Sequence, residues 1–239
     1  MNNKTIALSC FFGAIIAATI LAKPWVTIHH TKPIVVKGYA EMAVVSDSGS
    51  LTVSVVATDP SRAQAYSTAG TSLDRVQQII GTELGTSAQT EELSSHISAI
   101  AKVDANGRRT NITDFYSVSR QLRVTTQNVN KLARVARLLF DLNAQDLNVN
   151  IAGPDFFVSA LDPVKLELVS RATENGKKRA EVMAKDSGER LGPLVSARQG
   201  VIQITKPNSS NTSSYGVYDT ETIDKVVKLV VTLEYQVAD

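Results

Sequence analysis

Only three histidines offer acid–base or metal chemistry, and their positions give them no obvious partners. His29 and His30 are adjacent, so in an extended chain their imidazoles point in opposite directions. This geometry favours a solvated pair in a linker over a shared metal site. His96 lies in a strand-like run with no carboxylate or thiol close by in the sequence, which predicts a structural role. We therefore predict no catalytic residue, no metal site and no cofactor.

The familiar catalytic motifs are also missing. The sequence holds no pattern typical of zinc proteases, serine hydrolases or nucleotide-binding loops. Its one cysteine, Cys10, lies in an apolar N-terminal run and has no lipidation motif before it. Residues 24–239 therefore have no thiol for a disulfide, a zinc site or a nucleophile. An enzyme whose groups converge only in the fold remains an alternative.

Short clusters of charged and aromatic residues have structural as well as functional interpretations. Glu91 and Glu92 are strand neighbours that face opposite ways, which suits a solvated strand end better than an acid pair. The basic cluster 177–179 is flanked by acids, so a solvated helix face is favoured over a site for an anionic ligand or a lipid headgroup. Arg108 and Arg109 follow a predicted hairpin tip. They are interpreted as solvated residues of the turn, with an assembly contact as the alternative. Residues 156–157 are two adjacent phenylalanines. They predict either a binding pocket or interface, or a purely structural arrangement in which one ring is buried in the core and the other lies under a helix.

An uncharged run at residues 6–22 predicts a membrane segment. As a helix it would extend about 25 Å, slightly less than a hydrocarbon core of about 30 Å. Lys4 precedes the run and Trp25 follows it, as in export signals and membrane interfaces. We predict a signal anchor over residues 1–23, with cleavage after Ala22 as the alternative and a buried core helix as a third. Either of the first two places the body outside the cytoplasm.

The composition predicts a globular body with an aliphatic core. Of 239 residues, 43% are hydrophobic but only 5% aromatic. The net charge of +2 comes from Lys4 and Lys23, so residues 24–239 are formally neutral. A neutral body predicts no nucleic-acid partner and no polybasic membrane patch.

The first half of the body reads as two strand pairs, each followed by a helix. Runs 34–41 and 50–58 predict strands joined by a polar turn at 46–49, and Asp59-Pro60 predicts a helix start. Runs 89–103 and 109–125 predict a long hairpin around an Asn-Gly turn. On its return strand one face carries Val118, Leu122 and Val124 with Arg120. A helix over about 127–142 follows.

The second half contains one long helix between strands. A strand over 146–160 leads to Asp162 as the predicted N-cap of a helix over about 163–187, with Gly188 just beyond its end. Two pairs, Glu174/Lys178 and Glu181/Lys185, have the spacing of helical ion pairs. Ala172, Gly176, Ala180 and Ala184 form a line of small residues. That line predicts close packing on the helix's own sheet, with a contact between subunits as the alternative.

The chain closes with two more strands separated by a polar loop. Residues 194–205 predict a strand, and residues 206–222 a flexible loop rich in Ser, Asn and Thr. The final strand, 225–237, places alternate apolar residues from Val227 to Val237 on one face. The predicted order is ββαββαβαββ, an α+β fold with largely antiparallel sheets and helices on one face. The predicted domains are the anchor, a linker at 24–33, and one domain at 34–238.

The ordered set of these features resembles the SIMPL-domain family over roughly residues 33–238. The resemblance rests on the strands IVVKGYAE (34–41) and SLTVSVVAT (50–58), SRQLRVTT (119–126) before the helix NVNKLARV, the helix from Pro163 to Gly188, the Leu191-Gly192 step, and VVKLVVTLEYQV (226–237). The sequence departs from the family pattern at Ala40, where a second glycine is expected, and in a more charged long helix.

The resemblance implies an exported or membrane-anchored envelope protein of uncertain biochemical role. Members are linked to oxidative-stress tolerance, and some form large ring-like or barrel-like oligomers. The family supplies no established catalytic residues, so none is carried over. We predict a non-enzymatic, self-assembling protein, held at the membrane by residues 6–22, with an indirect role in stress tolerance. A monomeric binding module, with loop 206–222 as a lid, is the alternative.

Overall fold

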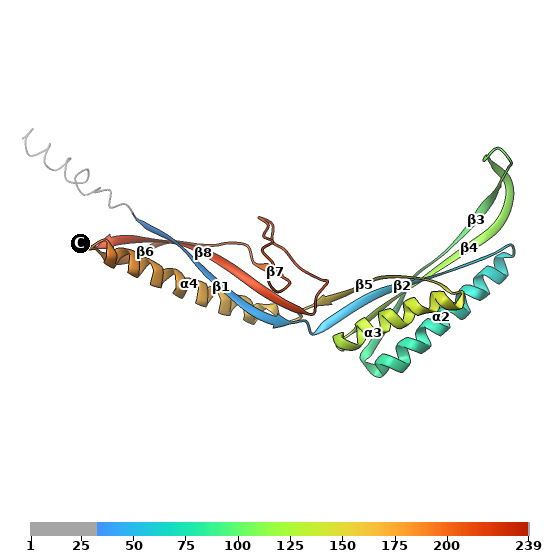
Figure 1. Cartoon of the computed structure of the whole chain (residues 1–239), viewed down its shortest axis with the longest axis horizontal. Helices are drawn as coiled ribbons and strands as arrows, with labels where there is room; N and C mark the ends of the chain where they lie inside the picture. The colour runs from blue at the N-terminus through green and yellow to red at the C-terminus, as the bar shows by residue number, and fades with distance from the viewer. Residues whose placement is uncertain (1–32, 239) are drawn as a thin grey trace, which may run out of the picture. The chain divides into compact units, whose positions relative to one another are not determined.

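The computed structural model describes residues 33–238, shown in Figure 1. The predicted membrane segment and the pair His29/His30 lie outside the described residues. Contacts divide the described chain into two compact units made of discontinuous segments. The first unit contains residues 33–38, 173–198 and 231–238, and the second contains residues 39–172 and 199–230.

The described part is a mixed α+β fold with two sheets and three α-helices, as predicted in outline. Its elements are β1 (Ile34–Val45), β2 (Ser48–Asp59), α2 (Arg62–Leu84), β3 (Ala88–Val103), β4 (Arg109–Thr126), α3 (Val129–Phe140), β5 (Asn148–Phe157), α4 (Leu161–Asp186), β6 (Arg190–Gln199), β7 (Gln203–Thr205) and β8 (Asp224–Ala238). Short 3-10 turns follow α2 and α3. The strand predicted over 194–205 is two strands, because the chain leaves β6 near Gly200 and pairs again with β8 only at β7.

The larger sheet has the order β3-β4-β2-β5 and is antiparallel throughout. Helices α2 and α3 cover one face, as Figure 1 shows. The alternation of β2 and β4 explains this: Leu51, Val53 and Val55 point to the same side as Leu122 and Val124, and all five are buried with the helices. The predicted face of β4 is therefore confirmed.

The other sheet has the order β1-β8-β6, and β7 also pairs with β8. Along β8 the residues predicted to share a face are buried, from Val227 through Tyr235 at every second position, and Val237 at the end is half-buried. The turn at 46–49 does not form a hairpin, because β1 and β2 belong to different sheets. The Ser46 amide donates to Ile223 O at 2.9 Å, and Asp47 accepts from the Ser159 hydroxyl at 2.7 Å. These bonds hold the chain where it leaves one sheet for the other.

The starts of helices α2 and α4 differ from the prediction, whereas the end of α4 agrees with it. Helix α2 begins after Ser61, whose hydroxyl accepts from Gln64 N at 3.4 Å, so the cap is not at Asp59-Pro60. Helix α4 begins at Leu161, which places Asp162 inside the first turn instead of at the N-cap. Its end is as predicted: Gly188 has φ +77°, and the Glu189 amide donates to Ala184 O at 2.9 Å.

The small-residue line of α4 packs on the helix's own sheet. Ala172, Ala180 and Ala184 are almost fully buried. A Cβ added to Gly176 would lie 2.7 Å from Leu233 Cδ1 and 3.2 Å from Gly38 Cα. The line is therefore used inside the protein, as the favoured interpretation predicted, and is not available for a contact between subunits. Of the predicted ion pairs, Lys178–Glu174 forms at 2.7 Å, whereas Glu181 pairs with Lys177 at 3.9 Å.

Candidate functional site

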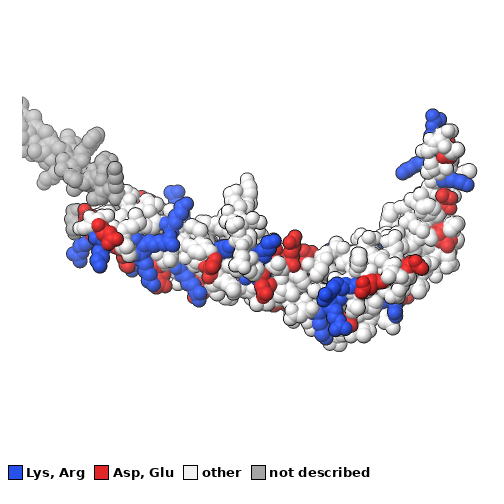
Figure 2. Space-filling model, viewed as in Figure 1, with Lys and Arg blue, Asp and Glu red and all other residues white. Residues whose placement is uncertain are grey.

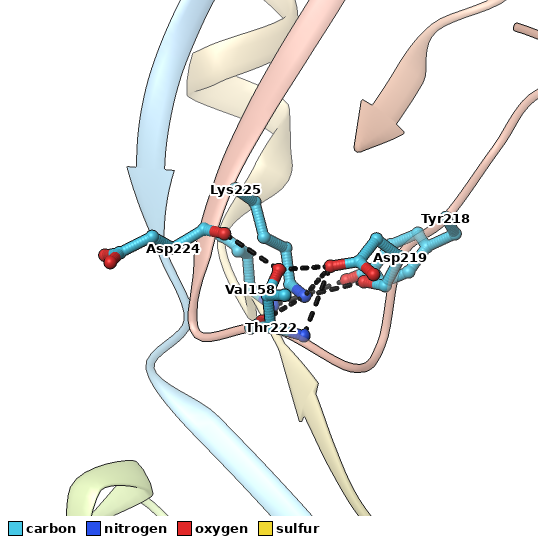
Figure 3. A network of polar contacts seen from close by, with 6 residues as sticks. All are labelled: Val158, Tyr218, Asp219, Thr222, Asp224 and Lys225. Carbon is cyan, nitrogen blue, oxygen red and sulfur yellow. Dashed lines mark hydrogen bonds and ion pairs between the residues drawn. The ribbon is translucent and has the colours of Figure 1, made fainter. Parts of the chain in front are cut away.

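A buried lysine at the start of β8 is the centre of a polar network in the second unit (Figure 3). The Lys225 side chain is completely buried. Its Nζ lies 3.1 Å from Asp219 Oδ2 and donates to Asp219 O at 2.6 Å and to Thr222 O. All three N–H donors of the ammonium group are thus used.

Asp219 is held in its charged form by the same network. Burial acts to raise the pKa of Asp219, but hydrogen bonds from Thr222 and the charge and hydrogen bond of Lys225 outweigh it, and the pKa is lowered. The Thr222 amide donates to Asp219 Oδ2 at 3.2 Å, and the Thr222 hydroxyl donates to the same oxygen. The Lys225 ammonium has no lone pair, and each of its protons is directed at an oxygen of the network. The network fixes the end of loop 206–222 to the start of β8.

Further hydrogen bonds fix this loop to its neighbours. The Gln203 amide donates to Ser213 O at 2.7 Å, Lys228 Nζ donates to Ser209 O at 2.6 Å, and Phe156 N donates to Thr220 O at 2.7 Å. The loop has no apolar period and no helix, as predicted, and its flexibility stays a prediction.

The two adjacent phenylalanines separate as the second interpretation predicted, with one difference. Phe156 is buried in the core between the sheet and its helices. Phe157 packs against Tyr218 of the loop, with ring centroids 6.3 Å apart, and not under a helix. The Tyr218 hydroxyl accepts from Val158 N at 3.3 Å (Figure 3). The aromatic pair therefore positions the loop.

The other candidate chemical groups are also paired or solvated. His96 Nε2 lies 2.9 Å from the Ser98 hydroxyl, with no carboxylate contact. Glu92 pairs with Arg120 at 2.8 Å on the helix face, and Glu91 with Arg123 at 3.8 Å on the other face, so the two acids do face opposite ways. Burial and a hydrogen bond to Glu41 raise the pKa of Tyr39 to about 12, which keeps that phenol protonated. Across the described residues no cluster of three metal-ligating side chains forms.

A groove of about 460 Å³ lies between α2 and α3. Its floor includes Ile79, Leu138 and Leu142. Its charged lining residues are Arg75, Glu83 and Asp141. Arg75 donates to Gln78 Oε1 at 2.7 Å within the groove, and Glu83 pairs with Arg134 at 3.4 Å. The size of the groove suits a small ligand.

The end of the β3–β4 hairpin projects as a two-stranded arm. Strand β4 pairs with β2 only as far as Tyr116, and beyond that point it pairs with β3 alone. We call residues 100–115 the arm. Its turn is capped by Asp104, whose carboxylate accepts from Asn106 N and Arg108 N at 2.9 Å each, and Gly107 has φ +78°.

The arm combines exposed apolar and basic side chains. Ile100, Val103 and Ile112 are 37%, 53% and 64% exposed, and Figure 2 shows Lys and Arg gathered near its tip. These bases include Arg108 and Arg109, which are exposed as predicted. A two-stranded ribbon is marginally stable alone in water, and three exposed aliphatic side chains on such a ribbon make it a candidate contact surface.

Sequence reasoning missed Lys225 and Asp219. A signal was present: Lys225 stands two residues before Val227, so it continues the alternation of the buried face of β8. A charged residue on a buried face needs a partner, but the sequence does not say that Asp219, six positions earlier in an irregular loop, supplies it.

None of the described helices is long and apolar enough to cross a membrane.

The described residues thus form an α+β fold of two sheets and three α-helices. A family model described as "Protein of unknown function (DUF541)" matches residues 34–234. The chain therefore belongs to the SIMPL family, as the resemblance indicated. Among curated proteins, none matches it.

Solved structures give only distant similarities. The de novo designed protein Foldit4 is 10% identical, with 43% of this chain and 93% of that one covered and a TM-score of 0.24. A putative amidohydrolase/peptidase from Burkholderia cenocepacia is 14% identical over 48% of this chain and 30% of that one, with a TM-score of 0.29. An amidase of the hydantoinase/carbamoylase family from Burkholderia multivorans is 14% identical over 57% and 33%, with a TM-score of 0.30. The chain spans about a third of the two Burkholderia proteins.

Proposed function

We propose that this chain is a non-enzymatic envelope protein that assembles with copies of itself. In this proposal residues 6–22 anchor it in the inner membrane, and the body lies on the extracytoplasmic side. The apolar run behind Lys4 supports the anchor. The pairing of Lys225, Asp219 and Glu92 within the protein supports a non-enzymatic body.

The arm is the observation that carries self-assembly. Its strands have no third strand beside them, and its exposed Ile100, Val103 and Ile112 have no partner element in the described chain. Burial of these side chains against another copy would stabilise the contact by about 25 cal/mol for each Å² of apolar surface removed from water. A neutral body also limits the repulsion between copies.

The proposal gives the chain an indirect role in oxidative-stress tolerance. The body has no thiol, and its oxidisable sulfur is limited to Met42 and Met183. Assembly at the envelope would act through its structure and not through a redox reaction.

Light scattering after size exclusion tests the proposal on the full chain in mild detergent, at several concentrations. A large assembly whose mass holds on dilution is the expected result, and it should persist when residues 1–23 are removed. A monomer both with and without those residues would rule out self-assembly.

The groove between α2 and α3 favours one second candidate, a monomeric binding module. Its apolar floor and volume of about 460 Å³ suit a small, partly apolar ligand. A monomer whose Leu138 and Ile79 signals shift in an NMR screen of small ligands would favour this function over assembly.

A further inference from the structure

The outer flank of α4 carries an apolar surface edged with basic side chains in the first unit. Asn175, Lys178, Arg179, Val182 and Met183 line a shallow hollow there; we call these five residues the α4 edge patch. Val182 is 57% and Met183 50% exposed, although both belong to a helix whose opposite side is buried. Neither Val182 nor Met183 contributes to the buried core.

The patch lies beside the free edge of β1. Strand β1 is the end strand of its sheet, and Arg179 Nη1 donates to Lys37 O on that edge at 3.2 Å. Only the backbone of Lys37 takes part, because Gly38 and the buried Val36 face the helix and the Lys37 side chain alternates to the other face of the sheet. On the α4 side, the apolar Val182 and Met183 lie beside the basic Lys178 and Arg179.

The direction of the two elements places the patch near the point where the chain enters the unit. Gly176 lies against Gly38, and Arg179 reaches back to Lys37, so the helix runs opposite to β1. Met183 stands two turns beyond Gly176, about 10 Å along the helix, and Ile34 is about 13 Å along the strand from Gly38. Met183 is thus level with the first residues of β1.

A short spacer ties that end of the unit to the predicted membrane segment. Residues 23–33 lie between the apolar run and β1, and even fully extended they span no more than about 40 Å. A tether of this length gives the patch a high effective concentration at the lipid surface. Weak apolar and headgroup contacts are then sufficient to hold it there.

The charges around the patch suit an anionic lipid surface. Lys178 and Arg179 line the same hollow as Val182 and Met183, and Figure 2 shows Lys and Arg side chains along α4 with acids between them. Glu174 is paired with Lys178 and Glu181 with Lys177. Asp186 and Lys185 at the helix end are exposed.

We propose that the α4 edge patch rests on the surface of the anchoring membrane, with Val182 and Met183 at the headgroup boundary and Lys178 and Arg179 near anionic lipid phosphates. This inference rests on the proposed anchor and adds a second point of contact. It fixes how the first unit meets the bilayer, which a flexible spacer alone does not do.

Site-specific fluorescence tests the contact on the full chain. Because the only native thiol is Cys10, a Cys10→Ser background accepts a single label at Met183→Cys, with Lys177→Cys on the opposite flank as the matched control. The labelled chains are reconstituted into phosphatidylethanolamine–phosphatidylglycerol vesicles with brominated acyl chains. We expect about threefold stronger quenching at position 183 than at 177, weaker quenching in phosphatidylcholine vesicles, and a loss of about half the effect with Val182→Glu.

Flotation separates failure of the anchor from failure of the patch. A chain that floats with the vesicles but is quenched equally at 183 and 177 overturns the patch contact and leaves the anchor intact. A chain that does not float overturns both. Protection of position 183 from aqueous iodide without quenching by brominated lipid overturns the lipid contact in favour of a second copy.

Discussion

Gly176 of α4 and Gly38 of β1 meet backbone to backbone, and this contact sets how closely the helix lies on its sheet. A Cβ on Gly176 would be 3.2 Å from Gly38 Cα and 2.7 Å from Leu233 Cδ1. The Leu233 side chain and the Gly38 backbone fill the space beside Gly176, so a side chain at position 176 requires the helix or Leu233 to move. On α4 the small-residue line is buried against the sheet, and the ion-paired side chains lie on the exposed side of the same helix.

Gly176→Ala is expected to lower the free energy of unfolding by about 1–3 kcal/mol, because the added methyl overpacks the contact with Leu233. Urea unfolding followed by circular dichroism measures the change. The control is Gly81→Ala in α2, where a Cβ meets nothing within 4 Å. It should raise stability by about 0.5–1 kcal/mol through helix propensity. Equal effects of the two alanines would contradict the packing described for Gly176.

Lys225→Met is expected to cost about 3 kcal/mol or more, because it leaves the Asp219 carboxylate and two carbonyl oxygens without their buried partner. Limited proteolysis should then cut within loop 206–222 faster than in the wild type. Lys206→Met, which removes an exposed lysine from the same loop, serves as the control and should change neither property. Unchanged proteolysis in the Lys225 variant would show that the network does not hold the loop.

Asp219 predicts a stability change at acid pH. Because its pKa is lowered in the folded protein, its contribution is fully present above the ordinary aspartate pKa of about 4 and is lost as the pH falls through the folded value. The stability advantage of the wild type over Asp219→Asn should therefore shrink below about pH 4. Unfolding by urea between pH 7 and pH 2 measures it.

Glu174→Gln provides the comparison for that pH series. The hydrogen bond and charge of Lys178 lower the pKa of Glu174, but both side chains are exposed, so solvent screens the pair. Its stability should follow the wild type across the range. A difference as large as that of Asp219→Asn would mean that burial is not what gives the Asp219 pair its strength.

Ile112→Ser is expected to reduce the mass of the assembly without lowering the stability of the fold, because the Ile112 side chain is 64% exposed and outside the core. Light scattering and thermal unfolding of the same sample measure the two properties. Phe140→Ser at the end of α3, also 65% exposed, is the matched loss of an apolar surface residue elsewhere. An assembly weakened by Phe140→Ser and not by Ile112→Ser would move the contact from the arm to α3.

The elements themselves follow from local patterns in the sequence. The alternation along β8, the Asn-Gly turn at the arm and the small-residue line of α4 each specify one element through short-range geometry. The family match over residues 34–234 agrees, because the ordered elements are what the resemblance rests on. These features depend on neighbouring residues alone, so one sequence suffices to predict them.

The pairing of distant residues is what only the tertiary structure decides. The turn at 46–49 has the composition of a hairpin, yet β1 and β2 enter different sheets. In the same way, Lys225 finds Asp219 and Arg179 reaches Lys37 O through contacts that no spacing encodes. Local propensity fixes the conformation of a segment, whereas the burial of apolar faces against one another selects which segments meet. The exposure of the arm and the packing of the small-residue line on the helix's own sheet are therefore properties of the folded chain.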